Sequence, residues 1–120
     1  MKLTNEDALK IIKGLSELEE LDLPLNIKTS YCLARIRQTL TPIVNTIQEK
    51  QLEVYKKHGE RTSRNEYKVP DEKIDDLQND LNELSQIENE VQLNKLKLDD
   101  FGDNNIPFYV IEKLLLIIEE

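Results

Sequence analysis

The sequence has no tryptophan, one histidine, one cysteine and three glycines among its 120 residues. The lone cysteine, Cys32, excludes both an internal disulfide and a zinc site built from several thiolates. Three scattered glycines leave no glycine-rich loop of the kind that cradles a phosphate. With only two phenylalanines and four tyrosines, the core has to be built mainly from leucine and isoleucine.

Long apolar runs are missing as well. The longest, residues 114–118, is far shorter than the roughly 20 residues that a membrane helix needs. The first seven residues lack the apolar segment of a secretory signal peptide. The net charge is −8, so the chain is repelled by bare nucleic acid and by anionic membranes. The sequence therefore predicts a single cytoplasmic domain, residues 1–120, that binds neither membrane nor nucleic acid directly.

Helical periodicity predicts a first helix over residues 5–20. Thr4 stands where an N-cap is expected, and Asp7 completes a motif resembling a capping box. Apolar residues recur at the spacing of one helix face: Ala8, Ile11, Ile12, Leu15 and Leu18. Gly14 interrupts the helix at a cost of ~1 kcal/mol relative to alanine, and Pro24 marks the turn that follows.

A second, longer helix is predicted over residues 28–58. Pro42 lies in its middle, where it removes one backbone hydrogen bond and clashes with the preceding turn. We expect either a kink over residues 38–41 or two abutting helices. Gly59 is a natural terminator. Three basic residues precede it, where cations favour the negative end of a helix: Lys56, Lys57 and His58.

A polar loop over residues 60–69 is expected to lead into a third helix over residues 70–88. Apolar residues at spacings of three and four form a narrow seam on that helix: Ile74, Leu77, Leu81 and Leu84. Because the other positions are polar, this helix can offer only a narrow stripe to one partner. The second and third helices are therefore predicted to form an antiparallel hairpin.

The pattern changes after the third helix. Residues 91–98 alternate with a period near two, which predicts a short strand or an extended segment. Residues 99–105 are typical of turns, and Pro107 suits the start of a last helix over residues 108–118. That helix is apolar nearly all round, so it is buried in the core or completes an interface. The predicted fold is mainly α, with at most one or two short strands.

Charge is segregated along the chain. Residues 27–68 carry nine basic and four acidic side chains, whereas residues 70–90 carry one basic and eight acidic. In one interpretation these charges complement each other across the hairpin. In the other, the acidic helix mimics nucleic-acid phosphates. Either way, the candidate partner-binding residues are the acidic face and the apolar seam: Asp71, Glu72, Asp75, Asp76, Asp80 and Glu83, with Ile74, Leu77, Leu81 and Leu84.

The sequence offers few residues that could form a catalytic or metal site. His58 reads as a helix-end cation, and Cys32 reads as a small buried thiol. The oxygen-rich residues 99–105 lack the ligand alternation of a calcium loop, so an Asx-type turn is the better interpretation. Four arginines, at positions 35, 37, 61 and 64, lack interleaved aromatics. We predict no enzymatic activity, no metal and no cofactor.

Five short segments, taken in order, resemble one protein family. They are LPLNIKTSYCLAR at residues 23–35, LTP at 40–42, YKKHGE at 55–60, LDDFG at 98–102 and the apolar tail from Pro107 to the double glutamate at the end. Similar stretches in this order occur in small, about 120-residue, uncharacterised proteins of tailed bacteriophages and prophages. Cys32 departs from that pattern, and so does Thr41, where an acidic residue is usual.

The resemblance implies a phage-encoded protein in the host cytoplasm or the virion, and it supplies no catalytic residues. A non-enzymatic accessory protein that binds a phage or host protein is the leading hypothesis. A minor virion component or a head or tail assembly chaperone is an alternative. An inhibitor of a host defence or nucleic-acid enzyme, acting through the acidic helix, is another. The surplus apolar surface on the third and last helices is compatible with a homo-oligomer.

Overall fold

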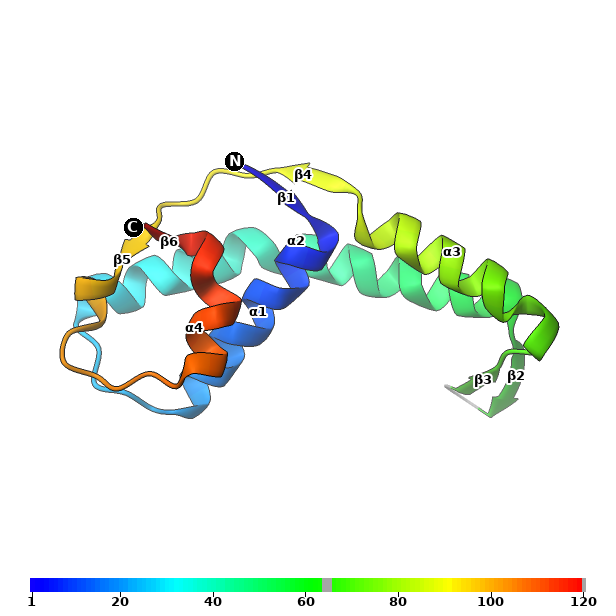
Figure 1. Ribbon diagram of the computed structural model, residues 1–120, viewed down its shortest axis with the longest axis horizontal. Coiled ribbons are helices and arrows are strands. Elements are labelled where there is room, and N and C mark those ends of the chain that lie inside the picture. The colour runs from blue at the N-terminus through cyan, green and yellow to red at the C-terminus, as the bar shows by residue number, and fades with distance from the viewer. Residues whose placement is uncertain (64–65, 120) are drawn as a thin grey trace.

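The protein is an elongated, mainly helical molecule of 52 × 28 × 22 Å (Figure 1). The computed structural model describes residues 1–63 and 66–119. It is 66% helical, which confirms the predicted mainly-α class. The helices are α1 (Asn5–Glu20), α2 (Ile27–His58), α3 (Ile74–Ser85) and α4 (Phe108–Leu114), with 3-10 turns at Asp71–Lys73, Leu98–Phe101 and Leu115–Ile117. The strands are β1 (Lys2–Thr4), β2 (Glu60–Ser63), β3 (Glu66–Lys68), β4 (Glu88–Glu90), β5 (Leu96–Lys97) and β6 (Ile118–Glu119).

Helix α1 has the predicted bounds because its local signals are strong. The Thr4 hydroxyl accepts a hydrogen bond from the Asp7 amide at 3.1 Å, and the Asp7 carboxylate accepts one from the Thr4 amide at 3.1 Å. This is the expected capping box. The chain leaves the helix through Asp22, whose φ is 48°, a left-handed conformation that aspartate tolerates better than most residues.

Helix α2 is one continuous element that passes through Pro42, so the alternative of two abutting helices is wrong. It begins at Ile27, one residue earlier than predicted, because the Asn26 side chain caps it by accepting from the Thr29 amide at 2.8 Å. Pro42 is exposed, where the loss of one helical hydrogen bond is easiest to accommodate. The Thr41 hydroxyl donates to the Arg37 carbonyl at 2.7 Å in the adjoining turn.

A β-hairpin, not the predicted loop, connects α2 to α3. Strands β2 and β3 pair antiparallel, with Glu60 opposite Lys68, and opposite charges at facing positions stabilise such pairs. Gly59 ends α2 as predicted, although its φ of −111° is not left-handed. A Cβ at Gly59 would lie 2.7 Å from the Tyr55 carbonyl oxygen, so close approach requires the glycine. Residues 64–65 of the predicted loop lie outside the described residues.

The antiparallel hairpin of α2 and α3 is confirmed, but α3 ends at Ser85 and not at residue 88. The chain then turns so that β4 pairs antiparallel with β1, placing Leu3 opposite Asn89. The strand predicted over residues 91–98 is limited to β5, which pairs parallel with β6. Strands are as short as predicted but more numerous, and the described residues form three two-stranded pairs.

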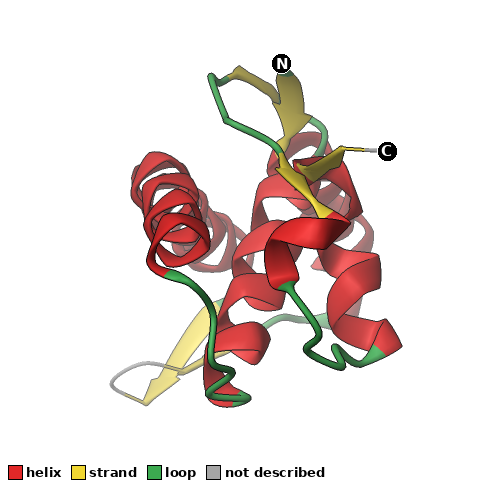
Figure 2. Ribbon diagram, turned by 90° about the vertical axis from the view of Figure 1, so that its left-hand side faces the viewer, coloured by secondary structure: helices red, strands yellow, loops and turns green. Residues whose placement is uncertain are grey.

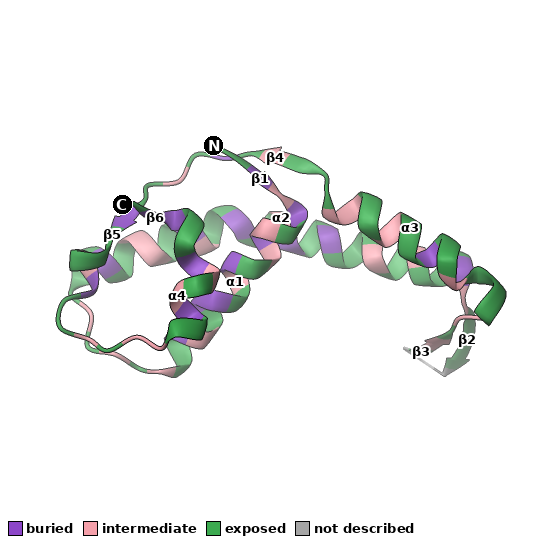
Figure 3. Cartoon of the chain, viewed as in Figure 1, coloured by how far each residue is buried: buried purple, intermediate pink, exposed green. Residues whose placement is uncertain are grey.

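Two regions of the molecule differ in how they are buried (Figure 3). The body comprises residues 1–41 and 86–119, and the arm comprises residues 42–63 and 66–85, the hairpin of late α2 and α3. Most buried apolar side chains form one cluster in the body, contributed by α1, early α2, α4 and the terminal strands. Strands β1 and β6, close to the two ends of the chain, lie on the same side of that body (Figures 1 and 2).

Helix α4 is buried on one face only. Val110 and Leu114 are fully buried, whereas Phe108, Tyr109 and Leu115 are exposed. The prediction that the last helix runs to residue 118 is wrong, because the chain tightens into a 3-10 turn after Leu114 and ends in β6.

Candidate functional site: the groove between α2 and α3

The arm is held together by an apolar seam. Leu77 is buried between the helices, and the other predicted seam residues, Ile74, Leu81 and Leu84, are half-buried. From α2, Val44 and Ile47 are buried and Val54 is half-buried. The predicted a/d stripe of α3 therefore serves mainly to attach α3 to α2.

Asp80 locks the two helices together at the far end of the arm. Its Oδ2 lies 2.6 Å from Nε2 of the buried His58 and 3.3 Å from Nζ of Lys57. The hydrogen bond with His58, followed by that from Lys57, holds the pKa of the Asp80 carboxyl below its ordinary value. The prediction that charges complement each other across the hairpin is confirmed at this carboxylate.

The other predicted acidic residues take no part in this contact. Asp71, Glu72, Asp75, Asp76 and Glu83 are exposed. Within the described part of the chain, the structure shows no ion pair from any of them. The predicted acidic face therefore separates into one structural carboxylate, Asp80, and five solvent-facing ones.

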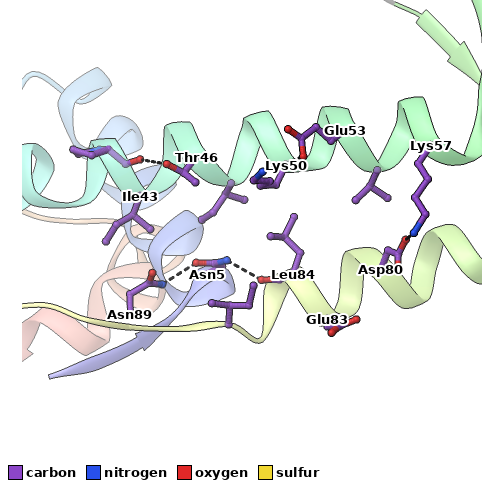
Figure 4. Close-up of a pocket in the computed structure, with 14 residues that line it drawn as sticks. Asn5, Ile43, Thr46, Lys50, Glu53, Lys57, Asp80, Glu83, Leu84 and Asn89 are labelled. Carbon is purple, nitrogen blue, oxygen red and sulfur yellow. Dashed lines mark hydrogen bonds and ion pairs between the residues drawn. The ribbon is translucent and has the colours of Figure 1, made fainter.

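A groove of about 740 Å³ runs along the arm between α2 and α3 (Figure 4). Its apolar lining includes Ile43, Ile47 and Val54 on α2, Leu84 in the last turn of α3, and Ile87 just after that helix. Four of these five apolar side chains are partly open to solvent, since Ile87 is 50% exposed and Ile43, Val54 and Leu84 are half-buried. The polar rim is formed by Thr46, Lys50, Glu53, Lys57, Asp80 and Glu83.

Asn5 closes the groove where the arm meets the body. Its buried side chain donates to the Leu84 backbone carbonyl at 2.8 Å and accepts from the side-chain amide of Asn89 at 2.8 Å (Figure 4). Its backbone amide donates to the Ile87 carbonyl at 2.9 Å. One side chain thus joins the start of α1, the end of α3 and β4, and it fixes the position of the arm on the body.

Only part of this site is visible in the sequence. Asp80, Glu83 and Leu84, among the predicted binding residues, line the groove. Ile74, Leu77 and Leu81 belong to the seam, and the remaining acidic residues, Asp71, Glu72, Asp75 and Asp76, are exposed and lie outside the groove lining. The α2 wall and Asn5 were missed, because an opening between two helices depends on how they are placed relative to each other.

The sequence also raised a metal site, the Cys32 thiol and the oxygen-rich residues 99–105 as possible sources of chemistry. No group of three or more His, Cys, Asp or Glu side chains in the described residues is arranged to hold a metal. Burial, and secondarily the nearby Asp100 carboxylate, raise the pKa of the half-buried Cys32 thiol, which disfavours the nucleophilic thiolate. The oxygen-rich stretch forms a turn, in which Asp100 accepts from the Lys97 amide at 2.8 Å and Asn104 donates to the Phe101 carbonyl at 2.7 Å.

Comparisons of the whole chain with known proteins found no relative. The chain matches no protein family, no curated protein and no solved structure. The resemblance to small proteins of tailed phages therefore stays a prediction. In the described residues, no helix combines the length and the apolar character that crossing a bilayer requires.

Proposed function

We propose that this protein is a non-enzymatic binding module whose α2–α3 groove receives an amphipathic helix of a partner protein. The observation that carries this proposal is the open apolar groove of about 740 Å³ along the arm. In the body, α2 is covered by α1, on which α4 packs in turn, but in the arm α3 is the only helix of the described residues that packs beside it (Figure 1). A third helix laid along the groove would complete a layered helical packing.

The groove has the dimensions of a helix-binding site. Its lining on α2 extends from Pro42 to Lys57, and at 1.5 Å per residue this corresponds to roughly 22 Å. A partner helix of about 15 residues spans that length. Anchors that recur every three or four residues from i to i+11, roughly 16 Å along the helix, would meet Ile43, Val54 and Ile87, as in other helix-in-groove complexes. Each fully buried anchor contributes about 1.5–3 kcal/mol.

The partner is proposed to be a phage or host protein in the cytoplasm of an infected bacterium, in accordance with the sequence resemblance. A role as a minor virion component or as an assembly chaperone uses the same groove. Mass spectrometry of purified particles distinguishes the two, because a virion component copurifies with particles and an intracellular factor stays in the lysate.

Site-specific photo-crosslinking tests the proposed function. A photoreactive amino acid replaces Thr46, which is exposed on the groove rim, and in a matched variant it replaces Leu52, which is exposed elsewhere on α2. Irradiation in cells that contain the natural partner should give a crosslink from position 46 and none from position 52. Mass spectrometry should map that crosslink to an amphipathic helical segment. Equal crosslinking from both positions, or none from either, contradicts the proposal.

The exposure of five carboxylates on α3 and the 3-10 turn before it favours a second candidate, inhibition of a nucleic-acid enzyme by phosphate mimicry. The test is to reverse Asp75 and Asp76 to lysine while leaving Asp80, whose reversal would also break the contact with His58. Inhibition that survives the double reversal contradicts this candidate.

A further inference from the structure

The two walls of the groove differ in charge. On α2, Lys50 is paired with Glu53, with Nζ and Oε2 3.1 Å apart. Lys57 is paired with Asp80 across the arm at 3.3 Å. Both lysines on the rim are therefore already neutralised by carboxylates of the same site, so neither offers a free positive charge to a ligand.

Carboxylates line the α3 side of the groove at helical spacing. Asp76, Asp80 and Glu83 stand at i, i+4 and i+7, which places them on one face of α3. Asp80 and Glu83 line the groove directly, and Asp76 lies one turn earlier on the same face. Asp76 and Glu83 are exposed and form no ion pair within the described ranges 1–63 and 66–119. Glu83 on the rim, and Asp76 one helical turn beyond the groove lining, are thus two uncompensated negative charges on this side of the groove.

From this asymmetry we infer that the docking helix is cationic, with an apolar stripe and lysine or arginine along the flank that faces α3. The inference rests on the proposed function, since it names the chemistry of the helix that fills the groove. An acidic helix would bring like charges against Asp76 and Glu83 without a free cation on the rim to compensate. The α2 rim, being neutral, imposes no such requirement on the other flank.

Two synthetic peptides test the inference with the full-length protein. Both have about 15 residues, the same leucine stripe and the same high helix propensity, and they differ only in bearing lysine or glutamate on one flank. Binding is measured by fluorescence anisotropy at low and high salt. The lysine peptide should bind about tenfold more tightly than the glutamate peptide, a ratio that two or three exposed charge pairs supply. The ratio should shrink in 1 M salt, where the Debye length is only ~3 Å and exposed charges are largely screened from each other.

A matched pair of charge reversals locates the effect. The double variant Asp76→Lys with Glu83→Lys should reverse the preference in favour of the glutamate peptide. The control, Asp71→Lys with Asp75→Lys, makes the same charge change at exposed positions that lie outside the groove lining and outside the i, i+4, i+7 series of Asp76, Asp80 and Glu83. It should leave the ratio close to that of the unaltered protein. Circular dichroism checks that both variants keep their helix content.

The outcomes separate the inference from the proposed function. If both peptides bind equally and Ile87→Asp abolishes binding, the groove takes an amphipathic helix and the charge inference is overturned. If neither peptide binds, the proposed function is overturned together with it. Sedimentation of the protein alone completes the set, because a dimer that Ile87→Asp dissociates would mean that a second copy fills the groove, which also overturns the inference.

Discussion

Replacing Gly14 by alanine sets two effects of opposite sign against each other. Within an ordinary helix, alanine is favoured over glycine by about 1 kcal/mol. In this protein, a Cβ at position 14 would lie 2.8 Å from Lys113 Cβ and 2.8 Å from Leu114 Cδ2, both on α4. Leu114 is fully buried, and Lys113 is held by its ion pair with Glu17 of α1. Neither atom has room to move aside, so α4 has to shift.

Overpacking of this kind costs about 1–3 kcal/mol. The clash therefore outweighs the gain in helix propensity, and Gly14→Ala should lower the free energy of unfolding by about 1 kcal/mol. Urea unfolding followed by circular dichroism measures this difference. The control is Ser16→Ala, at an exposed position of the same helix, which should raise stability by a few tenths of a kcal/mol. A Gly14→Ala variant that is more stable than the unaltered protein would refute the close packing of α1 on α4.

Three further perturbations test other parts of the fold. Asn5→Ala should lower the free energy of unfolding by about 1–3 kcal/mol, because it leaves buried polar groups at the base of the arm without their partner. Leu114→Ala should cost about 2–5 kcal/mol as a cavity in the body, whereas Leu115→Ala, at a neighbouring residue that is 59% exposed, should change stability by less than about 0.5 kcal/mol. Because the folded-state pKa of Asp80 lies below its ordinary value of 3.8, its contact with His58 should stabilise the protein fully above that value. The stabilisation should disappear as the pH falls through the lowered pKa.

Urea unfolding checks the first two perturbations, and equal losses for Leu114→Ala and Leu115→Ala would contradict the placement of α4. For Asp80, the measurement is the unfolding midpoint between about pH 2 and pH 6, since the titration lies near and below the usual aspartate value. Asp80→Asn should remove the part of the pH dependence that belongs to this carboxyl. An unchanged pH profile in that variant would show that Asp80 does not join the two helices.

How far the sequence predicts this fold depends on how local the determining interactions are. The bounds of α1 follow from Thr4 and Asp7, which act within one turn, and the end of α2 follows from Gly59. Strand β4 was missed because its sequence, ENE, has no apolar alternation. Its pairing with β1 is accompanied by a hydrogen bond between Asn89 of β4 and Asn5, which are far apart in the sequence. The hairpin β2–β3 was missed for the same reason, since the residues of its two strands are mostly polar.

The candidate site shows the same limit more strongly. The seam of α3 was predicted because Leu77 and its neighbours repeat at helical spacing. The groove was not, because Ile43 and Ile87 become neighbours only through the packing of α3 on α2. Asp80 looked like any other solvent-facing carboxylate until the fold brought His58 to within 2.6 Å.

The most direct test of the central claim is an amide chemical-shift map of the isotope-labelled protein during titration with the lysine-flanked amphipathic peptide. The account predicts that the shifts concentrate at Ile43, Thr46, Lys50, Val54 and Ile87, along both walls of the groove. Residues of the exposed α4 face, such as Phe108 and Tyr109, should remain unchanged. Shifts confined to α4, or scattered over the whole surface, would contradict the assignment of the α2–α3 groove as the binding site.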